Sequence, residues 1–197
     1  MDIVHVDDEL IVVNKPPGLL SVPGRSEPDC AITRLQQQHP EALTVHRLDQ
    51  ATSGLLLFAR GPEAQRRLSM DFEARRVGKR YVALVAGVLE EDEGWQEIAL
   101  PLMADWPNRP MQKVDPANGK PSLTRWRVLT VEGTRSRLEL EPVTGRTHQL
   151  RVHLHAIGHA IVGDTLYGGE AAARLMLHAT LIDMPDRGLR IESPPGF

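Results

Sequence analysis

Short apolar runs separated by polar turns dominate this chain of 197 residues, and they predict more strands than helices. Two strand-like runs, 3–6 and 10–14, flank an acidic turn and are typical of a hairpin. A continuous apolar run over 54–60 is typical of a buried strand. Further strands are expected where apolar residues alternate or gather, at 79–87, 122–131, 136–143 and 175–184.

Three segments have the features of helices. A short helix is expected over 30–38. A second begins near Pro62, a residue favoured in the first turn of a helix, and it carries apolar residues at helical spacing, at Ala64, Leu68 and Phe72. A third is expected over 148–157 and ends at Gly158, in the position where left-handed caps occur.

Two further segments predict irregular structure. The acidic residues that follow residue 87 are typical of a loop. Residues 105–121 carry four prolines and predict an irregular excursion that leads into a hairpin turn at Asn118-Gly119. Because hairpin-like spacing outweighs regular strand–helix alternation, the pattern favours the α+β class with a largely antiparallel sheet. The length fits one domain, or one with two closely packed halves.

The formal net charge of −3 does not by itself mark a nucleic-acid binder, but the charges are segregated along the chain. Residues 60–80 carry seven Lys or Arg against three acids, whereas residues 86–105 carry six acids and no Lys or Arg. Arginine makes up 19 of the 23 cations, and its planar guanidinium suits phosphate and stacked bases. This distribution fits a basic RNA-binding face, or equally a genome that prefers arginine codons, with the charges on solvated faces.

The rest of the composition bounds the environment of the protein. A single cysteine, Cys30, excludes an intramolecular disulfide and suits a reducing compartment. The N-terminus lacks the basic segment and long apolar run of a leader, and no apolar stretch approaches the roughly 18 residues typical of a membrane helix. We therefore expect a cytoplasmic protein with no membrane partner, and a monomer, because no long apolar surface stripe is evident.

Asp49 lies in the polar segment 46–54, directly before the buried strand. A carboxylate in such a loop is placed to be partly desolvated while an adjacent cation keeps it ionised. The alternative is that Asp49 is a turn residue whose side chain bonds the backbone of Thr52 or Ser53.

Two other segments carry more polar residues than a core element needs. Four histidines lie between residues 148 and 159, but no acid lies between residues 145 and 163 and no zinc-ligand spacing is present, so we expect no metal site. Tyr81 follows Lys79-Arg80 on an expected strand. An aromatic ring among cations suits the stacking of an RNA base, and the alternative is a core tyrosine.

Four stretches of the chain, in order, resemble the RluA family of RNA pseudouridine synthases. The match covers about residues 10 to 168, with strand-like similarity beyond, and is specific because each stretch is several residues long. The stretches are 14–18 with 21–24, then 46–49 with 52–54, then 79–87, and then 144–153 with 163–168. Residues 19–25 and 105–114 resemble the members of this family that act on two kinds of RNA.

The resemblance implies a single catalytic domain over 1–197, without an N-terminal S4 domain. Its fold would be a mixed, mainly antiparallel central sheet with flanking helices and a central RNA-binding cleft. The implied reaction is the isomerisation of uridine in RNA to pseudouridine, with no metal and no organic cofactor. The implied partners are stem-loops of 23S rRNA and the anticodon loop of tRNA.

The resemblance also implies roles for individual residues. Asp49 matches the nucleophile, which attacks either the uracil ring or the anomeric carbon of the ribose. Arg151 matches the basic residue that pairs with this carboxylate. Tyr81 matches the aromatic residue that stacks on the target base and helps to remove its C5 proton.

A second group of residues is expected to bind the RNA substrate. Arg47 matches the arginine that fills the space left when the uridine is extracted from the stem-loop, and Leu150 matches an apolar residue near the base. His46 belongs to the same motif as Arg47. From charge and loop position alone, phosphate contacts are expected from Arg109, Lys113 and Lys120.

Two other functions compete with this interpretation. A catalytically silent protein that binds RNA stem-loops would use the same residues without modifying a base. A metal-dependent hydrolase built on the histidines would lose its activity with a chelator. The presence of Asp49, Tyr81 and Arg151 together favours the synthase.

Overall fold

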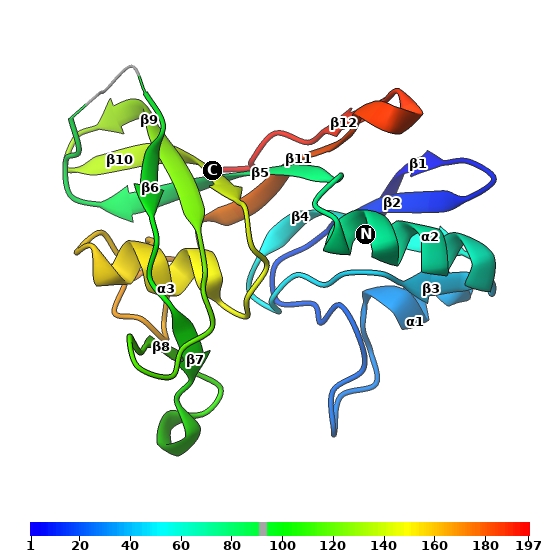
Figure 1. Ribbon diagram of the computed structural model, residues 1–197, viewed down its shortest axis with the longest axis horizontal. Helices are drawn as coiled ribbons and strands as arrows, with labels where there is room; N and C mark the ends of the chain where they lie inside the picture. The colour runs from blue at the N-terminus through cyan, green and yellow to red at the C-terminus, as the bar shows by residue number, and fades with distance from the viewer. Residues whose placement is uncertain (91–93) are drawn as a thin grey trace. The chain divides into compact units, whose positions relative to one another are not determined.

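A computed structural model describes residues 1–90 and 94–197 of the chain (Figure 1). These residues form two compact units. The first unit comprises Met1–Lys79 and His178–Gly196, and the second comprises Arg80–Leu177 and Phe197. Among the described residues, no helix has the length and apolar character needed to span a membrane.

The first unit is built on strands that pair mainly antiparallel. Its strand order is β1-β2-β4-β11, with β2 antiparallel to both β1 and β4 and with β11 parallel to β4 at His178 and Ala179. Two short strands pair at its margins, β3 with β4 and β12 with β11. The bounds are β1 Asp2–Val6, β2 Leu10–Lys15, β3 Ala42–Thr44, β4 Ser53–Arg60, β11 Leu177–Met184 and β12 Leu189–Glu192.

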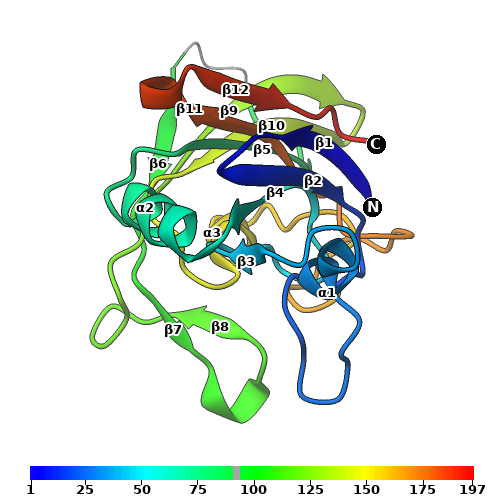
Figure 2. The same cartoon turned by 90° about the vertical axis from the view of Figure 1, so that its right-hand side faces the viewer.

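Two α-helices and a 3₁₀ helix complete the first unit. They are α1 Ala31–Gln36, α2 Pro62–Glu73 and η2 Pro185–Arg187, and Figure 2 shows α1 and α2 below the β1–β2 hairpin. Proline at the first position starts α2, and its apolar face buries Ala64 and Leu68 against β2, β4 and β11. The two sides of this core therefore come from the apolar spacing of α2 and the continuous apolar run of β4.

Gly54 allows β4 and β11 to approach each other. Its φ is +112°, and a Cβ atom there would lie 2.3 Å from the carbonyl oxygen of Ala179. Only glycine adopts this conformation at little cost and leaves room for the neighbouring strand. The parallel pairing that begins β4 therefore depends on this glycine.

The second unit contains the strand order β5-β10-β9-β6, in which β10 pairs antiparallel with β5 and β9, and β9 with β6. A separate antiparallel pair is formed by β7 and β8. The bounds are β5 Gly78–Ala86, β6 Gln96–Ile98, β7 Leu102–Ala104, β8 Gln112–Val114, β9 Thr124–Glu132, β10 Arg135–Pro142, the 3₁₀ helix η1 Trp106–Asn108 and helix α3 Gln149–Ala156. Alternate residues of β10 are buried, as its sequence pattern predicts.

The α+β class and the mainly antiparallel pairing are confirmed, as are the three helices. One local prediction is wrong in part and a second is wrong. The segment after residue 87, expected as a loop, is irregular at 88–90 and 94–95 but contains β6 and β7 farther along; its residues 91–93, part of the acidic run, lie outside the described residues. The expectation of a single domain over 1–197 stays a prediction.

The second wrong prediction is the hairpin turn at Asn118-Gly119. The turn from Asp115 to Gly119 does not join two strands that pair with each other. The segments on either side of it both pair with β7, since Val114 of β8 lies opposite Leu102 on one edge and Lys120 lies opposite Leu102 on the other. A Cβ atom at Gly119 would lie 2.7 Å from the carbonyl carbon of Pro101. The glycine thus serves close packing against the chain before β7 rather than a hairpin.

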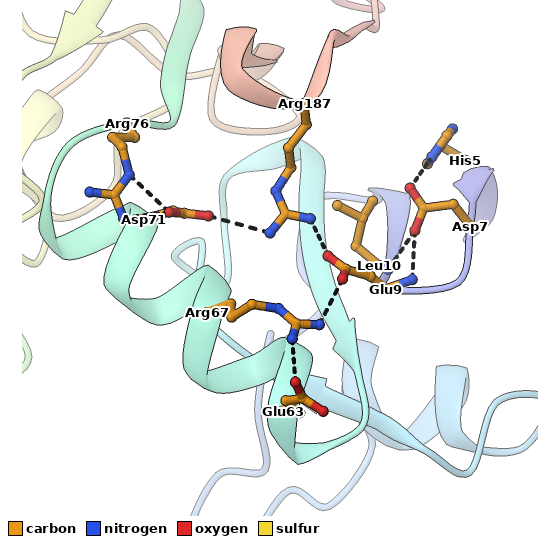
Figure 3. Close-up of polar contacts among 9 residues, drawn as sticks. All are labelled: His5, Asp7, Glu9, Leu10, Glu63, Arg67, Asp71, Arg76 and Arg187. Atoms are coloured by element: carbon orange, nitrogen blue, oxygen red, sulfur yellow. Dashed lines mark hydrogen bonds and ion pairs between the residues drawn. The ribbon is translucent and has the colours of Figure 1, made fainter.

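Among the cations of 60–80, Arg60, Arg67 and Arg76 form ion pairs within the first unit, and Figure 3 shows those of Arg67 and Arg76. Glu9, in the β1–β2 turn, accepts hydrogen bonds from Arg67 of α2, at 2.6 Å, and from Arg187 of η2. Arg76 pairs with Asp71 at 2.6 Å. These ion pairs connect the β1–β2 turn, α2 and η2.

Candidate functional site

Lys15, the last residue of β2, holds the loop that contains Asp49. The side chain is fully buried. Its Nζ donates hydrogen bonds to three carbonyl oxygens, at 3.0 Å to Pro16, 2.7 Å to Leu19 and 3.1 Å to Gln50. A buried ammonium group is costly unless its three N–H groups find acceptors, so each of these contacts compensates its burial. The backbone that follows Asp49 is thereby tied to the end of β2.

Ser21 holds the residue on the other side of Asp49. Its hydroxyl donates to the carbonyl oxygen of Leu48 at 2.7 Å and accepts from the Leu48 N–H at 3.0 Å. The N–H of Thr52 bonds the main-chain oxygen of Asp49 at 3.1 Å, so backbone closes the turn. Asp49 itself is half-buried. Its main chain is fixed on both sides while part of its side chain reaches solvent.

A buried polar chain anchors the start of β4, just after this loop. The Ser53 hydroxyl lies 2.8 Å from Nδ1 of His178, whose Nε2 lies 3.3 Å from the hydroxyl of Ser193. Asn14 donates to the same Ser193 hydroxyl at 3.1 Å. Satisfied buried networks of this kind rigidify their surroundings. The loop of Asp49 therefore ends on a rigid strand.

His46 anchors the beginning of the same loop. Its Nε2 accepts the backbone N–H of Leu57 at 2.9 Å, and its ring stacks on Phe72 with 4.5 Å between the centroids. Burial, with the charge of Lys79, lowers the pKa of His46 to about 3. His46 is therefore neutral with its proton on Nδ1, and it fixes the backbone beside the exposed Arg47.

In the second unit, Arg151 of α3 forms a buried ion pair with Asp164. Its Nε and Nη2 donate to the two carboxylate oxygens at 2.8 and 2.7 Å, and the side chains are 4% and 1% exposed. Asp164 also accepts the backbone N–H groups of Leu166 and Tyr167, at 3.0 and 3.2 Å. The paired carboxylate fixes the plane of the guanidinium group.

Gln149, at the start of α3, organises the preceding loop. Its Oε1 accepts hydrogen bonds from the Thr144 hydroxyl at 2.7 Å and the Arg146 N–H at 3.0 Å. Its Nε2 donates to the Leu123 carbonyl at 2.9 Å and the Thr124 hydroxyl at 3.0 Å. The polar residues of 144–149 thus include one fully engaged buried amide that ties the loop to β9.

The histidines of this region have separate structural partners. His153 is buried, and its ring lies between the Thr124 hydroxyl at 2.9 Å and the Leu100 carbonyl at 2.9 Å. His148 contacts the Tyr167 hydroxyl at 2.7 Å, and His159 the Ala86 carbonyl at 2.9 Å. Burial lowers the pKa of His153. Within 1–90 and 94–197, no group of three His, Cys, Asp or Glu side chains is placed to hold a metal ion.

Tyr81 lies on β5 opposite Leu140 of β10 and is half-buried. The neighbouring Arg80 pairs with Glu141 at 2.9 Å and stacks over Trp95, 4.9 Å from the ring centroid. Leu150 of α3 is buried. The tyrosine is thus neither fully buried, as a core residue would be, nor set among cations that lack partners.

The three candidate phosphate-binding residues lie on one excursion around the β7–β8 pair. Arg109, Lys113 and Lys120 are all exposed. Lys113 lies 3.8 Å from the carboxylate of Asp115, and the guanidinium carbon of Arg109 lies 3.5 Å from the ring centroid of Trp106. Their exposure suits contact with a polyanion.

Comparison with known proteins decides the family of this chain. A family profile described as "RNA pseudouridylate synthase" matches residues 9–156. The Dual-specificity RNA pseudouridine synthase RluA of Pasteurella multocida (strain Pm70) is 45% identical over 208 residues, covering 100% of this chain and 94% of that protein. The chain belongs to the RNA pseudouridylate synthase family. The protein of the same name from Escherichia coli (strain K12) is 48% identical, covering 91% of this chain and 84% of that protein.

Solved structures agree with this assignment. Human RNA Pseudouridylate Synthase Domain Containing 1 superposes with a TM-score of 0.83 at 32% identity, over 99% of this chain and 83% of that one. Human RNA Pseudouridylate Synthase Domain Containing 4, at 24% identity and a TM-score of 0.78, has the same fold; it covers 98% of this chain and 88% of that one.

As an RNA pseudouridylate synthase, the chain is an isomerase that acts on uridine in RNA. The predicted family and reaction are confirmed. The structure adds residues that the sequence did not single out for a role, namely Lys15, Ser21, Gln149 and Asp164. One signal was visible for all four, since each lies within a stretch that resembles the family. The roles of the individual predicted residues stay predictions.

We expect Asp164→Asn to lower the free energy of unfolding of this pseudouridylate synthase by about 3–5 kcal/mol, because it removes the carboxylate charge that pairs with the buried Arg151 guanidinium group. Urea unfolding measures the change. Glu170→Gln is the matched control, since Glu170 pairs with Arg135 at 2.7 Å with both side chains 40% exposed, and such surface pairs contribute about 1 kcal/mol at most. Equal losses in the two variants would contradict the role of the buried pair.

His46 makes the stability of the protein depend on pH. The unfolded chain binds a proton at His46 below about 6.5, whereas the folded protein does so only near pH 3. Between these values the unfolded state binds more protons, so stability falls as the pH falls, by about 1.4 kcal/mol per pH unit from this residue. His46→Gln retains an acceptor for Leu57 and loses this contribution.

The measurement is urea unfolding of wild type and His46→Gln at intervals between pH 7 and pH 4. We expect the wild type to lose more stability than the variant across this range. The exposed His155→Gln serves as the control and should follow the wild type. A variant that loses stability in parallel with the wild type would show that His46 is not held neutral.

Proposed function

We propose that this pseudouridylate synthase modifies stem-loops of both 23S rRNA and tRNA, and that Asp49 is its nucleophile. Two substrate classes are supported by the names of the relatives, which are described as dual-specificity enzymes at 45% and 48% identity. The resemblance of residues 19–25 and 105–114 to such enzymes supports the same conclusion.

The observation that carries the assignment of Asp49 is the immobilised backbone around it. Ser21 holds Leu48, and Lys15 holds Gln50, while the Asp49 side chain is half-buried. A nucleophile gains most from a loop that fixes its position before the substrate arrives, because orientation is then achieved without further loss of entropy. A half-buried side chain also leaves the carboxylate within reach of a substrate.

The proposed isomerisation consumes no reactant besides the uridine itself. The bond between uracil N1 and ribose C1′ breaks, and a bond between uracil C5 and C1′ forms. The proton on C5 leaves to solvent, and N1 becomes an N–H. Asp49 attacks either the uracil ring or C1′, and in both cases its carboxylate is regenerated when the product forms.

The proposal also assigns roles to the other residues. Tyr81 stacks on the base and assists removal of the C5 proton, and Arg151 is the basic residue that pairs with the catalytic carboxylate. Arg47 fills the space that the extracted uridine leaves, a role its exposure suits. The remaining substrate-binding residues are His46, Leu150, Arg109, Lys113 and Lys120.

We further propose that the enzyme works as a cytoplasmic monomer without a metal or organic cofactor. The single cysteine, which suits a reducing compartment, supports the location. Every bond change above is completed by the uridine, water and protein side chains. A chelator should therefore leave the activity unchanged, whereas a hydrolase built on the histidines would lose it.

We expect Asp49→Asn, which nearly preserves shape, to reduce pseudouridine formation to background while RNA affinity stays within a few-fold of wild type, because only the nucleophile is lost. Tritium release from transcripts labelled at uracil C5 measures turnover, and filter binding measures affinity. One transcript is a tRNA with an intact anticodon loop, and the other is a 23S rRNA fragment. The exposed Asp8→Asn is the matched control.

Each outcome of this experiment has one meaning. If wild type and Asp8→Asn release tritium from both transcripts and Asp49→Asn does not, the result supports Asp49 as the nucleophile and the dual specificity. Release from one transcript only contradicts the dual specificity. Substantial turnover by Asp49→Asn overturns Asp49 as the nucleophile. RNA binding without release by wild type would favour the silent stem-loop binder for these RNAs.

A further inference from the structure

Trp106 is an exposed aromatic residue that the proposed reaction does not use. Its side chain is 63% exposed, the highest value among the large apolar side chains in the part of the chain that the structure describes. It begins η1 at the tip of the loop between β7 and β8. An indole this exposed gives up the free energy of burial, so a partner that covers it would recover that free energy.

The loop that carries Trp106 is closed by its own hydrogen bonds. The backbone N–H of Asp105 bonds the Met111 carbonyl, and those of Asn108 and Met111 bond the carbonyls of Asp105 and Asn108, each at 3.0 Å. The Asn108 amide donates to the Asp105 carboxylate at 2.8 Å. The tip is therefore held in one shape, and Trp106 is presented by a preorganised turn.

The base of the loop is fixed to the second unit. Met111 packs against a small core made by Leu102, Val152 and Tyr167. The N–H of Gln112 donates to the Tyr167 hydroxyl at 2.8 Å. The loop tip is exposed while its base is anchored, and a rigid scaffold of this kind commonly carries binding residues.

The surroundings of Trp106 select the chemistry of its partner. Arg109 lies 3.5 Å from the indole centroid and covers one face of the ring as a cation–π pair. Residues 105–120 carry three cations, Arg109, Lys113 and Lys120, against two acids, in a chain with a net charge of −3.

Both acids of this loop are engaged in its turns. Asp105 accepts from Asn108 at 2.8 Å, and Asp115 accepts the N–H groups of Ala117 and Asn118 at 3.1 and 2.9 Å. Among the charged and aromatic side chains of the loop, the exposed ones are Trp106, Arg109, Lys113 and Lys120. An aromatic ring beside cations is the combination that binds unpaired bases together with their phosphates.

We infer that Trp106 is a stacking platform for one unpaired base of the RNA substrate, with Arg109 bracing the ring from its other face and contacting an adjacent phosphate. This inference rests on the proposed function, because the partner is the substrate RNA. Trp106 contributes to the selection of the RNA rather than to the bond changes at the uridine.

The consequence is a division between binding and chemistry. Stacking of a base on an aromatic ring contributes about 1–3 kcal/mol, which corresponds to at least about a fivefold change in affinity. We expect Trp106→Ala to raise KM and Kd by at least about fivefold and to leave kcat within about twofold. Trp106→Phe keeps a planar ring and retains most of the affinity, whereas Trp106→Leu keeps apolar bulk without the ring and behaves like Trp106→Ala.

Salt dependence separates the two residues of the platform. Trp106→Ala removes no phosphate contact, so the slope of log Kd against log salt stays at its wild-type value. Arg109→Ala removes one phosphate contact and lowers that slope by about one. Leu129→Ala is the control, because Leu129 is an exposed apolar residue of β9, 40% accessible, in the same unit.

The test uses the full chain and whichever of the two transcripts the wild type converts. Steady-state tritium release gives KM and kcat, and fluorescence anisotropy gives Kd over a range of salt. Substrates with a single abasic nucleotide at each unpaired position then identify the stacked base. At that one position the wild type and Trp106→Ala bind equally, since the base that distinguishes them is missing.

The possible results are distinct. A Trp106→Ala enzyme with wild-type KM and Kd overturns the inference, as does a Trp106→Leu enzyme that binds as well as Trp106→Phe, because the apolar bulk alone would then suffice. An affinity loss that persists with every abasic substrate also overturns it. Absence of turnover in the wild type on both transcripts is a failure of the proposed function, and Kd values for the same variants still decide the stacking.

Discussion

The position of Asp49 depends on the ammonium group of Lys15, which is buried at the end of β2 and compensated by three carbonyl oxygens. One of those oxygens belongs to Gln50, so a charge that would be costly alone becomes the link between β2 and the loop before β4. Ser21 adds the second link at Leu48. These polar contacts fix a loop that no regular secondary structure holds.

The second unit also contains buried polar groups whose partners come from other segments of the chain. Asp164 compensates the buried charge of Arg151 and fixes its plane, and Gln149 shapes the loop that leads into the same helix. In both units a polar group that is costly to bury is matched by partners from other segments. The candidate functional residues are thus positioned by satisfied buried polar groups, while the apolar core supplies the rigid strands and helices behind them.

Much of this fold could be predicted from periodicity, because β4, β10 and α2 each carry an apolar pattern that is strong by itself. Strands of three residues, such as β3 and β6, could not, since they form only where a longer neighbour offers hydrogen bonds. In the site, the polar segment that carries Asp49 could be recognised from its place before a buried strand, whereas the role of Asp49 came from the family resemblance and stays a prediction. Lys15 and Asp164 bond Gln50 and Arg151, which lie 35 and 13 residues away, so no periodicity reveals these contacts.

Turnover of Lys15→Met tests most directly whether the buried ammonium positions Asp49. Unfolding curves first establish a temperature at which the variant is fully folded, and stopped single-turnover tritium release and RNA affinity are then compared with wild type at that temperature. We expect the folded variant to bind RNA as wild type does but to isomerise uridine at least about tenfold more slowly, because Gln50 is no longer tied to the end of β2. A folded Lys15→Met enzyme with the wild-type rate would contradict it.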